Sequence, residues 1–312
     1  MRRRFATVDV FTTVAFGGNP LAVVLDAGGL STAQMQAVAR EFNYVETTFV
    51  LPPRDAANTA QVRIFTPDRE LPFAGHPNVG TAFVLARRGE AFGRTLSDHV
   101  MFEEGAGLVP VRILRDGGEA VGAELTAPAP FQRGPTVDPA LVAAAVSLAV
   151  DDIEMGAHGS VVASVGLPFL IAELGSRDAL RRIVPDPAAL AEVFGRAGVT
   201  GLHLYTRDIA PGDAPGERCD LSARMVCRMP TVVEDPATGS ANCALAALLA
   251  ELASQPDAAV ELAIAQGVDM GRPSLLHARA RKRAGTVEAV HVGGRCVAMM
   301  EGSFDLLSQS CT

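Results

Sequence analysis

The chain has 312 residues, of which 48% are hydrophobic and 20% are charged, and its formal net charge is −8. This length allows two domains with separate cores, and the composition is that of a folded chain. The acidic balance argues against a nucleic-acid partner, which would need clustered Lys and Arg, and no run of 18 apolar residues predicts a membrane span.

Residue types that bind metals or cofactors are dispersed. The five cysteines form no C-x-x-C pair, so we expect a reduced, cytoplasmic protein. The six histidines form no H-E-x-x-H pair, so no metal site is expected. No glycine-rich nucleotide motif occurs, which removes the sequence evidence for a bound nucleotide. The basic run at residues 2–4 has no apolar segment after it, which indicates a solvated strand start and not a targeting signal.

The first part of the chain predicts two strands, an amphipathic helix, two more strands and a second helix. Ser31 is an N-cap with Gln34 at the reciprocal capping-box position, and this helix ends near Asn43. Glu46 follows near a strand start; a carboxylate there is usually solvated, so spacing alone leaves its role open. The expected strands are 6–11, 21–25, 45–51 and 61–66, and a turn region at 67–77 leads to an apolar helix at 79–86.

A meander and a proline-rich segment follow. Strands at 100–103, 108–114 and 120–125 are separated by glycines, and residues 128–135 are the predicted linker. We therefore expect an N-terminal domain at 1–127 and a C-terminal domain at 136–294, with residues 295–312 returning to the first domain.

The second half predicts short helices interleaved with strands. Helices are expected at 139–150, 177–183 and 187–197, and strands at 160–165, 169–173, 201–206, 221–226, 259–265, 275–281, 286–291 and 296–301.

Residues 234–250, EDPATGSANCALAALLA, join an acidic turn to a helix with almost no polar face. Ser240 is the expected N-cap, and a helix that is apolar all round must be buried. The free amides of its first turn create an anion-binding point beside Glu234 and Asp235. This corner is therefore a candidate active site.

The same layout occurs 164 positions earlier, where PFAGHPN at 72–78 matches PATGSAN at 236–242 in proline, glycine and asparagine. Similar strands, RIF at 63–65 and RMV at 224–226, precede the two turns. Chance matches in an Ala- and Gly-rich chain are the alternative. The pattern predicts two related halves, each a curved, mostly antiparallel sheet around one helix; a layered α+β arrangement is the other possibility.

Five ordered blocks together resemble the PhzF-type isomerase family of phenazine biosynthesis, within the diaminopimelate epimerase and proline racemase-like superfamily. The blocks are DVF with GNPLAV at 9–23, NYVETTF at 43–49, RIFTP with ELPFAGHP at 63–77, EDPATGSA at 234–241 and QGVDMGRPS at 266–274.

The resemblance implies an α+β, diaminopimelate-epimerase-like fold with two pseudo-symmetric, barrel-like domains. It implies a homodimer and a cofactor-free isomerase or epimerase that moves a proton on carbon in a small carboxylate substrate, similar to trans-2,3-dihydro-3-hydroxyanthranilate isomerase. The site residues that it implies are Glu46 as general acid and base, His76 and Asp235 as its assistants, and Gly75, Gly239 and Ser240 as ligands of the substrate carboxylate.

Two other functions stay open. Relatives that racemise or epimerise amino acids place a thiol pair at the two helix starts, where this chain has Ala74 and Thr238. Cys243 lies inside the apolar helix and is expected to be an inert core thiol. The third possibility is a carboxylate-binding protein without turnover.

Overall fold

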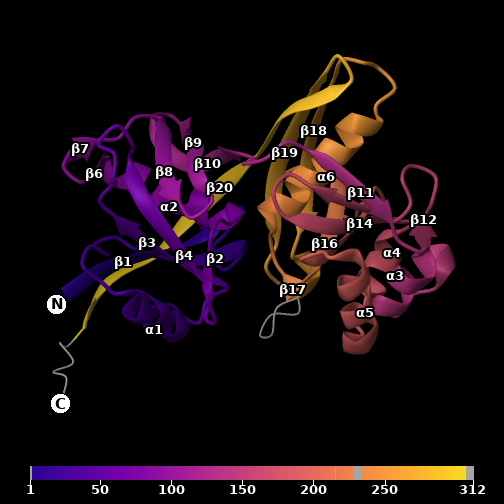
Figure 1. Cartoon of the computed structure of the whole chain (residues 1–312), viewed down its shortest axis with the longest axis horizontal. Coiled ribbons are helices and arrows are strands. Elements are labelled where there is room, and N and C mark those ends of the chain that lie inside the picture. The colour runs from indigo at the N-terminus through magenta and orange to yellow at the C-terminus, as the bar shows by residue number, and fades with distance from the viewer. Residues whose placement is uncertain (1, 215, 228–233, 307–312) are drawn as a thin grey trace. The chain divides into compact units, whose positions relative to one another are not determined.

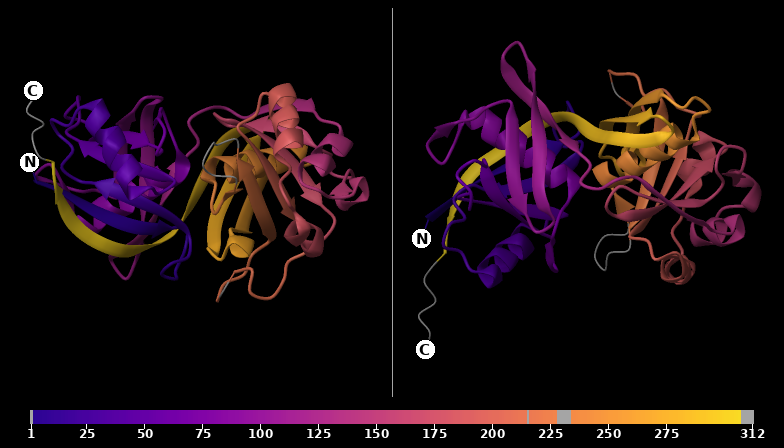
Figure 2. Two further views of the ribbon diagram at one scale, coloured as in Figure 1. Left: turned by 90° about the horizontal axis from the view of Figure 1, so that it is seen from below. Right: turned by 45° about the horizontal axis from the view of Figure 1, so that its top comes forward.

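The computed structural model describes residues 2–214, 216–227 and 234–306, and its contacts divide the chain into two units (Figure 1). The first unit contains the residues up to Leu125 and those from Gly294 onward; the second contains Thr126–Gly293. Strand β20, Thr286–Asp305, contributes to both, and it is the long yellow strand in Figure 2.

The sequence predicted two strands, at 286–291 and 296–301, where the structure has the single strand β20; Gly293 and Gly294 lie between the two predicted strands. The glycines are part of a close approach between strands. A Cβ atom on Gly122 in the neighbouring strand would collide with the Gly294 carbonyl oxygen. The small residues therefore preserve strand pairing here and do not interrupt it.

The first unit is a closed eight-stranded barrel. Pairing runs from β20 through β1, β2, β3, β4, β8, β9 and β10 and returns to β20. Its elements are β1 (Arg2–Val10), β2 (Asn19–Val24), α1 (Thr32–Phe42), β3 (Glu46–Leu51), β4 (Ala60–Phe65), β5 (Glu70–Leu71), α2 (Gly75–Arg88), β6 (Glu90–Ala91), β7 (Arg94–Thr95), β8 (His99–Glu104), β9 (Gly107–Asp116) and β10 (Glu119–Thr126).

Helix α2 is the core of this barrel. Its first twelve residues are buried, and it packs against β1, β2, β3 and β9. Gly80 permits this packing, since a Cβ atom there would lie 2.6 Å from Leu21 Cδ2 and 2.8 Å from Val10 Cγ2. A buried hydrogen bond of 2.8 Å between the Thr48 and Thr81 hydroxyls joins β3 to the helix. The helix is thus held in one position by packing and by a polar contact.

Helix α1 begins with the capping box that the sequence predicted. Ser31 accepts from Gln34 N, and the Gln34 side chain accepts from Ser31 N. The helix ends at Asn43, whose left-handed backbone turns the chain into β3. Its buried face, centred on Met35 and Ala39, packs against the sheet.

The second unit has an eight-strand order that runs from β20 through β19, β18, β16, β15, β14 and β13 to β11. Its elements are β11 (Gln132–Thr136), α3 (Pro139–Ala145), η1 (Val150–Asp152), β12 (Ile153–Glu154), β13 (Val161–Ser164), β14 (Pro168–Leu174), α4 (Arg177–Arg182), α5 (Pro187–Ala197), β15 (Gly201–Thr206), β16 (Leu221–Cys227), β17 (Glu234–Asp235), α6 (Gly239–Leu252), β18 (Ala258–Gln266), η2 (Val268–Met270) and β19 (Ser274–Arg283).

The two units repeat one pairing pattern. In the first, the successive pairs β1–β2, β2–β3, β3–β4, β4–β8 and β8–β9 alternate between antiparallel and parallel. In the second, β13–β14, β14–β15, β15–β16, β16–β18 and β18–β19 alternate in the same order. In each unit one 14-residue helix, α2 or α6, connects the fourth pair. The predicted α+β fold with two pseudo-symmetric units around central helices is therefore confirmed.

Several predicted bounds were wrong. The linker 128–135 is part strand, since β11 begins at Gln132 and pairs with β13. The helix predicted at 139–150 ends at Ala145, and Ser147 has a positive φ of 57°. The short helices α3, α4 and α5 lie together in Figure 1. Their buried apolar residues form one core with residues of β14 and β15. Within the part of the chain described, no helix is long and apolar enough to cross a membrane.

Candidate functional site

Glu46 and His76 meet in the interior of the first unit. Glu46 is the first residue of β3 and is 7% exposed; His76 is the second residue of α2 and is 5% exposed. The Nδ1 atom of His76 lies 3.3 Å from Glu46 Oε2. The structure thus brings together two predicted catalytic residues that are 30 positions apart in the sequence.

The environment of His76 keeps its ring neutral. Burial lowers the pKa of His76 to about 3, because the imidazolium form would lose its hydration. The second ring nitrogen, Nε2, is buried and has no hydrogen-bond partner among the residues that the structure describes. A neutral imidazole can donate one proton and accept another, which suits it to work beside a carboxyl group.

The start of α2 differs from the prediction. The helix begins at Gly75 and not near Val79, so His76 and Pro77 belong to its first turn. Ala74 is the N-cap and makes no side-chain capping bond, while Asn78 Nδ2 donates to the Ala74 carbonyl over 2.9 Å. A proline in the first turn of a helix costs no hydrogen bond, because the amides there have no partner within the helix. Pro77 is therefore part of the helix, although the sequence pattern assigned it to the preceding turn.

The start of α6 has the same construction. Thr238 is the N-cap, so the predicted capping role of Ser240 was wrong: Ser240 is a half-buried residue of the first turn. Gly239, the first helical residue, is buried. Asn242 Nδ2 donates to the Thr238 carbonyl over 3.0 Å, as Asn78 does to Ala74. In both helices the first-turn amides have no partner within the helix itself, which is the feature that anion sites at helix starts use.

Asp235 lies beside the start of α6 and is 8% exposed. Its carboxylate accepts a hydrogen bond of 2.5 Å from the Thr238 hydroxyl. Its backbone carbonyl accepts one of 2.8 Å from Gln266 Nε2. Asp235, Gly239 and Ser240 are therefore grouped in the second unit, as the sequence predicted, but Gln266 was not named as a site residue. Its place in the QGVDMGRPS block was the available signal.

Glu234, the other carboxylate of the acidic turn, is part of an ion pair. Arg224 donates to both of its oxygens, over 2.7 and 2.8 Å. In the first unit Arg63 makes the equivalent pair with Glu70, over 2.7 and 2.6 Å. These bidentate pairs fix the short strands β17 and β5 in front of the two turns.

Neither helix start carries a cysteine at its N-cap. Ala74 and Thr238 are the N-caps at which a thiol racemase would need cysteines. Cys243 is buried, and burial raises the pKa of Cys296 to about 12. In residues 2–214, 216–227 and 234–306, no three His, Cys, Asp or Glu side chains group closely enough to hold a metal ion. Cys311 lies outside the described residues.

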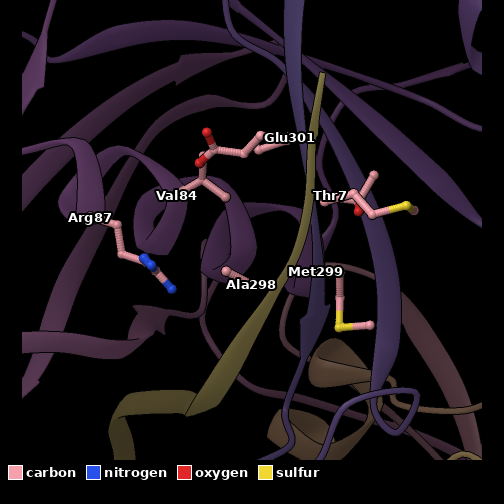
Figure 3. Close-up of a pocket in the computed structure, with 8 residues that line it drawn as sticks. Thr7, Val84, Arg87, Ala298, Met299 and Glu301 are labelled. Carbon is pink, nitrogen blue, oxygen red and sulfur yellow. The ribbon is translucent and has the colours of Figure 1, made fainter. Parts of the chain in front are cut away.

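Figure 3 shows a pocket in the first unit, whose volume is about 100 Å³. Thr7 of β1, Val84 and Arg87 of α2, and Ala298 and Glu301 of β20 are among its lining residues. A second pocket, of about 220 Å³, is lined in the second unit by residues that include Glu154, Glu173 and Arg207. None of the predicted site residues lines either pocket.

Comparison with known proteins identifies the family. The model of the family described as "Phenazine biosynthesis-like protein" matches residues 8–302. The chain belongs to this family. It is 36% identical over 304 residues to trans-2,3-dihydro-3-hydroxyanthranilate isomerase from Pseudomonas chlororaphis, with 97% of this chain and 99% of that protein covered.

Two further relatives agree with this membership. An uncharacterised isomerase from Mesorhizobium japonicum is 36% identical over 303 residues, covering 96% of this chain and 98% of that protein. The crystal structure of a PhzF-family phenazine biosynthesis protein from Bacillus anthracis superposes with a TM-score of 0.86, covering 98% and 100% of the chains at 22% identity. At this identity the superposition establishes the shared fold. The curated relatives identify this member of the family as an isomerase.

Proposed function

We propose that this isomerase moves a proton on carbon in a small carboxylate substrate without a cofactor, and that Glu46 is its general acid and base. The observation that carries the proposal is the 3.3 Å contact between Glu46 and the neutral His76 in the interior of the first unit. A base that removes a proton from carbon and returns it must exchange protons readily, and the adjacent imidazole can orient and hydrogen-bond the carboxyl group.

In the proposed reaction, the Glu46 carboxylate takes a proton from a substrate carbon and the electron pair of the broken C–H bond moves into an enol-like system. The resulting Glu46 carboxylic acid then gives the proton to another carbon, so atoms and charge balance. Amides of a helix start stabilise the negative charge that develops on the substrate. We assign Gly75, Gly239 and Ser240 to the binding of the substrate carboxylate, and Asp235 to assistance in proton transfer.

The named relatives make trans-2,3-dihydro-3-hydroxyanthranilate the leading candidate substrate. Three of them carry that substrate in their names at 36% identity. This compound is a small carboxylate, as the proposed helix-start site requires. We therefore propose this substrate as the first to be assayed.

An amino-acid racemase with two thiol bases is the weaker alternative, because Ala74 and Thr238 occupy the N-caps where such bases would lie. A carboxylate-binding protein without turnover is the other. The Glu46–His76 contact favours turnover, since a binding role needs no buried base beside an imidazole.

The deciding measurement is incorporation of deuterium from D₂O into the substrate, followed by NMR. Wild-type protein should isomerise the substrate and incorporate deuterium at the carbon that receives the proton. Glu46→Gln should lower the rate by about 10²-fold to 10⁴-fold, the usual contribution of a general acid and base. Glu41→Gln, on the exposed face of α1, is the matched control and should retain wild-type exchange.

Unchanged exchange in Glu46→Gln would show that another group transfers the proton. If instead the wild-type protein binds the compound tightly, forms no isomerised product and incorporates no deuterium, the binding protein without turnover becomes the better description.

A further inference from the structure

Gln266, the last residue of β18, connects the turn before α6 through both ends of its side chain. Its Oε1 accepts from Thr238 N over 3.2 Å and from Asn242 Nδ2 over 2.8 Å. Its Nε2 donates to the Asp235 carbonyl over 2.8 Å and to the Thr238 hydroxyl over 3.1 Å. Gln266 is fully buried. Only a side chain with a donor and an acceptor can satisfy all four groups.

The next residue brings the backbone of β18 against the same turn. Gly267 has a φ of +74°, and a Cβ atom there would lie 2.6 Å from the Pro236 carbonyl oxygen. A side chain is therefore excluded by both conformation and space. The turn that carries Asp235 is thus hydrogen-bonded to the Gln266 side chain and packed against the Gly267 backbone.

The strand registers identify the residue that occupies the same position in the first unit. Arg63 and Arg224 are equivalent, since each pairs with the glutamate of the following short strand. Two residues earlier, Gln61 pairs with Glu103 and Ser222 pairs with Ala265, in parallel ladders. Glu103 and Ala265 are therefore equivalent, and so are the residues that follow them, Glu104 and Gln266.

The surroundings of Glu104 match this assignment. A Cβ atom on the following Gly105 would lie 3.0 Å from Pro72 Cα, as Gly267 approaches Pro236. The amide side chain of Asn78, the counterpart of Asn242, interacts with the carboxyl group of Glu104. The turn before α2 therefore packs on the carboxyl group of Glu104, whereas the turn before α6 packs on the carboxamide of Gln266.

The oxygens of Glu104 lack the partners that a carboxylate requires. Both are shielded from solvent, and neither makes a hydrogen bond of standard geometry with a described residue. Asn78 Oδ1 is likewise a buried acceptor without a donor in that part of the chain. The cluster holds acceptors and needs a donor, which a protonated carboxyl group supplies.

Charged groups of the neighbouring elements are engaged elsewhere. On β8, Glu103 accepts from the backbone amides of Arg54 and Asp55 and from the Asn58 side chain. On β5, Glu70 is held by Arg63, and on α2, His76 faces Glu46. On β9, Gly107 is the residue that pairs with Glu104.

We propose that Gln266 and Glu104 are equivalent positioning residues, each fixing the turn before its buried helix, and that Glu104 does so as a neutral carboxylic acid. The inference rests on the proposed function only in treating these turns as substrate-binding elements. Gln266 orients Asp235 and the amides of Gly239 and Ser240; Glu104 supports the turn of Gly75 and His76.

The neutral state has a measurable consequence. Burial raises the pKa of Glu104 to about 8, against the weaker opposing effect of Asn78. The folded protein therefore retains a proton that the unfolded chain loses above about pH 4.5. The contribution of Glu104 to stability is therefore constant below about pH 4.5, falls between pH 4.5 and pH 8, and is constant again above pH 8. Within the falling range, the unfolding equilibrium constant rises about tenfold per pH unit.

Reciprocal substitutions test the proposal. In Gln266→Glu, the carboxylate cannot donate to the Asp235 carbonyl, so the Thr238 amide should lose about tenfold of its hydrogen-exchange protection at pH 8.5 relative to wild type. Protonation at pH 5.5 restores a donor and should bring the protection close to wild type. The ratio of variant to wild-type kcat/KM should show the same pH dependence.

The reciprocal variant Glu104→Gln replaces the neutral acid by a neutral amide. It should fold and lose the decline in stability between pH 4.5 and 8. The matched control for Gln266→Glu is Gln36→Glu, because the Gln36 side chain also donates hydrogen bonds to loop carbonyls, those of Thr66 and Pro67. It should leave Thr238 protection unchanged at both pH values.

Equal loss of Thr238 protection at pH 5.5 and 8.5, or no loss at either, overturns the role of Gln266. A wild-type stability profile in Glu104→Gln overturns the neutral acid. Should Gln266→Glu fail to fold at both pH values, Gln266→Met fills the same volume, and wild-type Thr238 protection in that variant overturns the proposal. Hydrogen exchange at Thr238 and the pH dependence of unfolding are both measured without substrate. A protein without isomerase activity would therefore reject the proposed function, while these two measurements would still decide the positioning roles of Gln266 and Glu104.

Discussion

The Oε2 atom of Glu46 lies 3.3 Å from Nδ1 of His76, although one residue begins a barrel strand and the other lies in the first turn of the enclosed helix. Both side chains are buried, and the imidazole is neutral. The pair therefore holds a carboxyl group next to a ring that can exchange a proton without becoming a stable cation.

Buried neutral histidines should make the protein acid-sensitive, and His203 offers a test of this expectation. Burial lowers the pKa of His203 to about 4, so below pH 6.5 the unfolded chain binds a proton that the folded protein does not. Stability is present above pH 6.5 and should fall by about 1.4 kcal/mol per pH unit toward pH 4. His76 acts in the same direction down to lower pH.

Urea unfolding between pH 7 and pH 4 measures this effect. Between pH 6.5 and pH 4, the free energy of unfolding of His203→Leu should fall less steeply than that of wild type, by about 1.4 kcal/mol per pH unit. His277→Leu, at an exposed position of β19, is the control and should follow the wild-type profile. Parallel profiles for wild type and His203→Leu would contradict the assignment of acid sensitivity to this residue.

Gly239→Val tests the proposed binding of substrate by the start of α6. Gly239 is buried at the first helical position, so two added methyl groups should block approach of a ligand to the backbone. We expect loss of turnover and of ligand affinity, whereas Glu46→Gln should lose turnover and retain affinity. Calorimetric titration and steady-state kinetics separate the two effects.

Thermal melting must accompany these measurements, because valine could also disturb the helix. A Gly239→Val protein that melts normally and turns over at the wild-type rate would show that the start of α6 does not bind the substrate.

Gly80→Ala should destabilise the first unit by about 1–3 kcal/mol, the usual cost of overpacking a core. The new methyl group would meet Leu21 Cδ2 at 2.6 Å and Val10 Cγ2 at 2.8 Å. Gly195→Ala is the matched control in α5, where a Cβ atom meets nothing within 4 Å, and it should stabilise the protein by about 0.5–1 kcal/mol. Urea denaturation distinguishes the opposite signs, and a stabilising Gly80→Ala would mean that the barrel can expand around α2.

Alkylation of accessible thiols should leave the isomerase activity unchanged. Cys219, Cys243 and Cys296 are buried, and burial raises the pKa of Cys219 and Cys296, which lowers their reactivity. Iodoacetamide treatment followed by the kinetic assay gives the measurement, and mass spectrometry identifies the modified residues. Loss of activity in proportion to modification would revive the thiol racemase.

The sequence was sufficient for the fold because its signals are local and repeated. The prolines, glycines and asparagines at 72–78 and 236–242 recur before two apolar helices, and these became the N-terminal turns of α2 and α6. It failed at boundaries where a local signal has two meanings. Pro77 indicated a turn but lies in the first turn of α2, and Ser240 indicated an N-cap but lies inside α6.

What the sequence determined by itself was the set of residues near each helix start and the membership in an isomerase family, because ordered motifs and residue periodicity are properties of the chain alone. The tertiary structure decided which distant residues contact one another: that Glu46 meets His76, that Glu234 is held by Arg224, and that Gln266 lies beneath the turn of Asp235. The physical reason is that burial and hydrogen bonding depend on strand register, which brings together segments that are separated in the sequence.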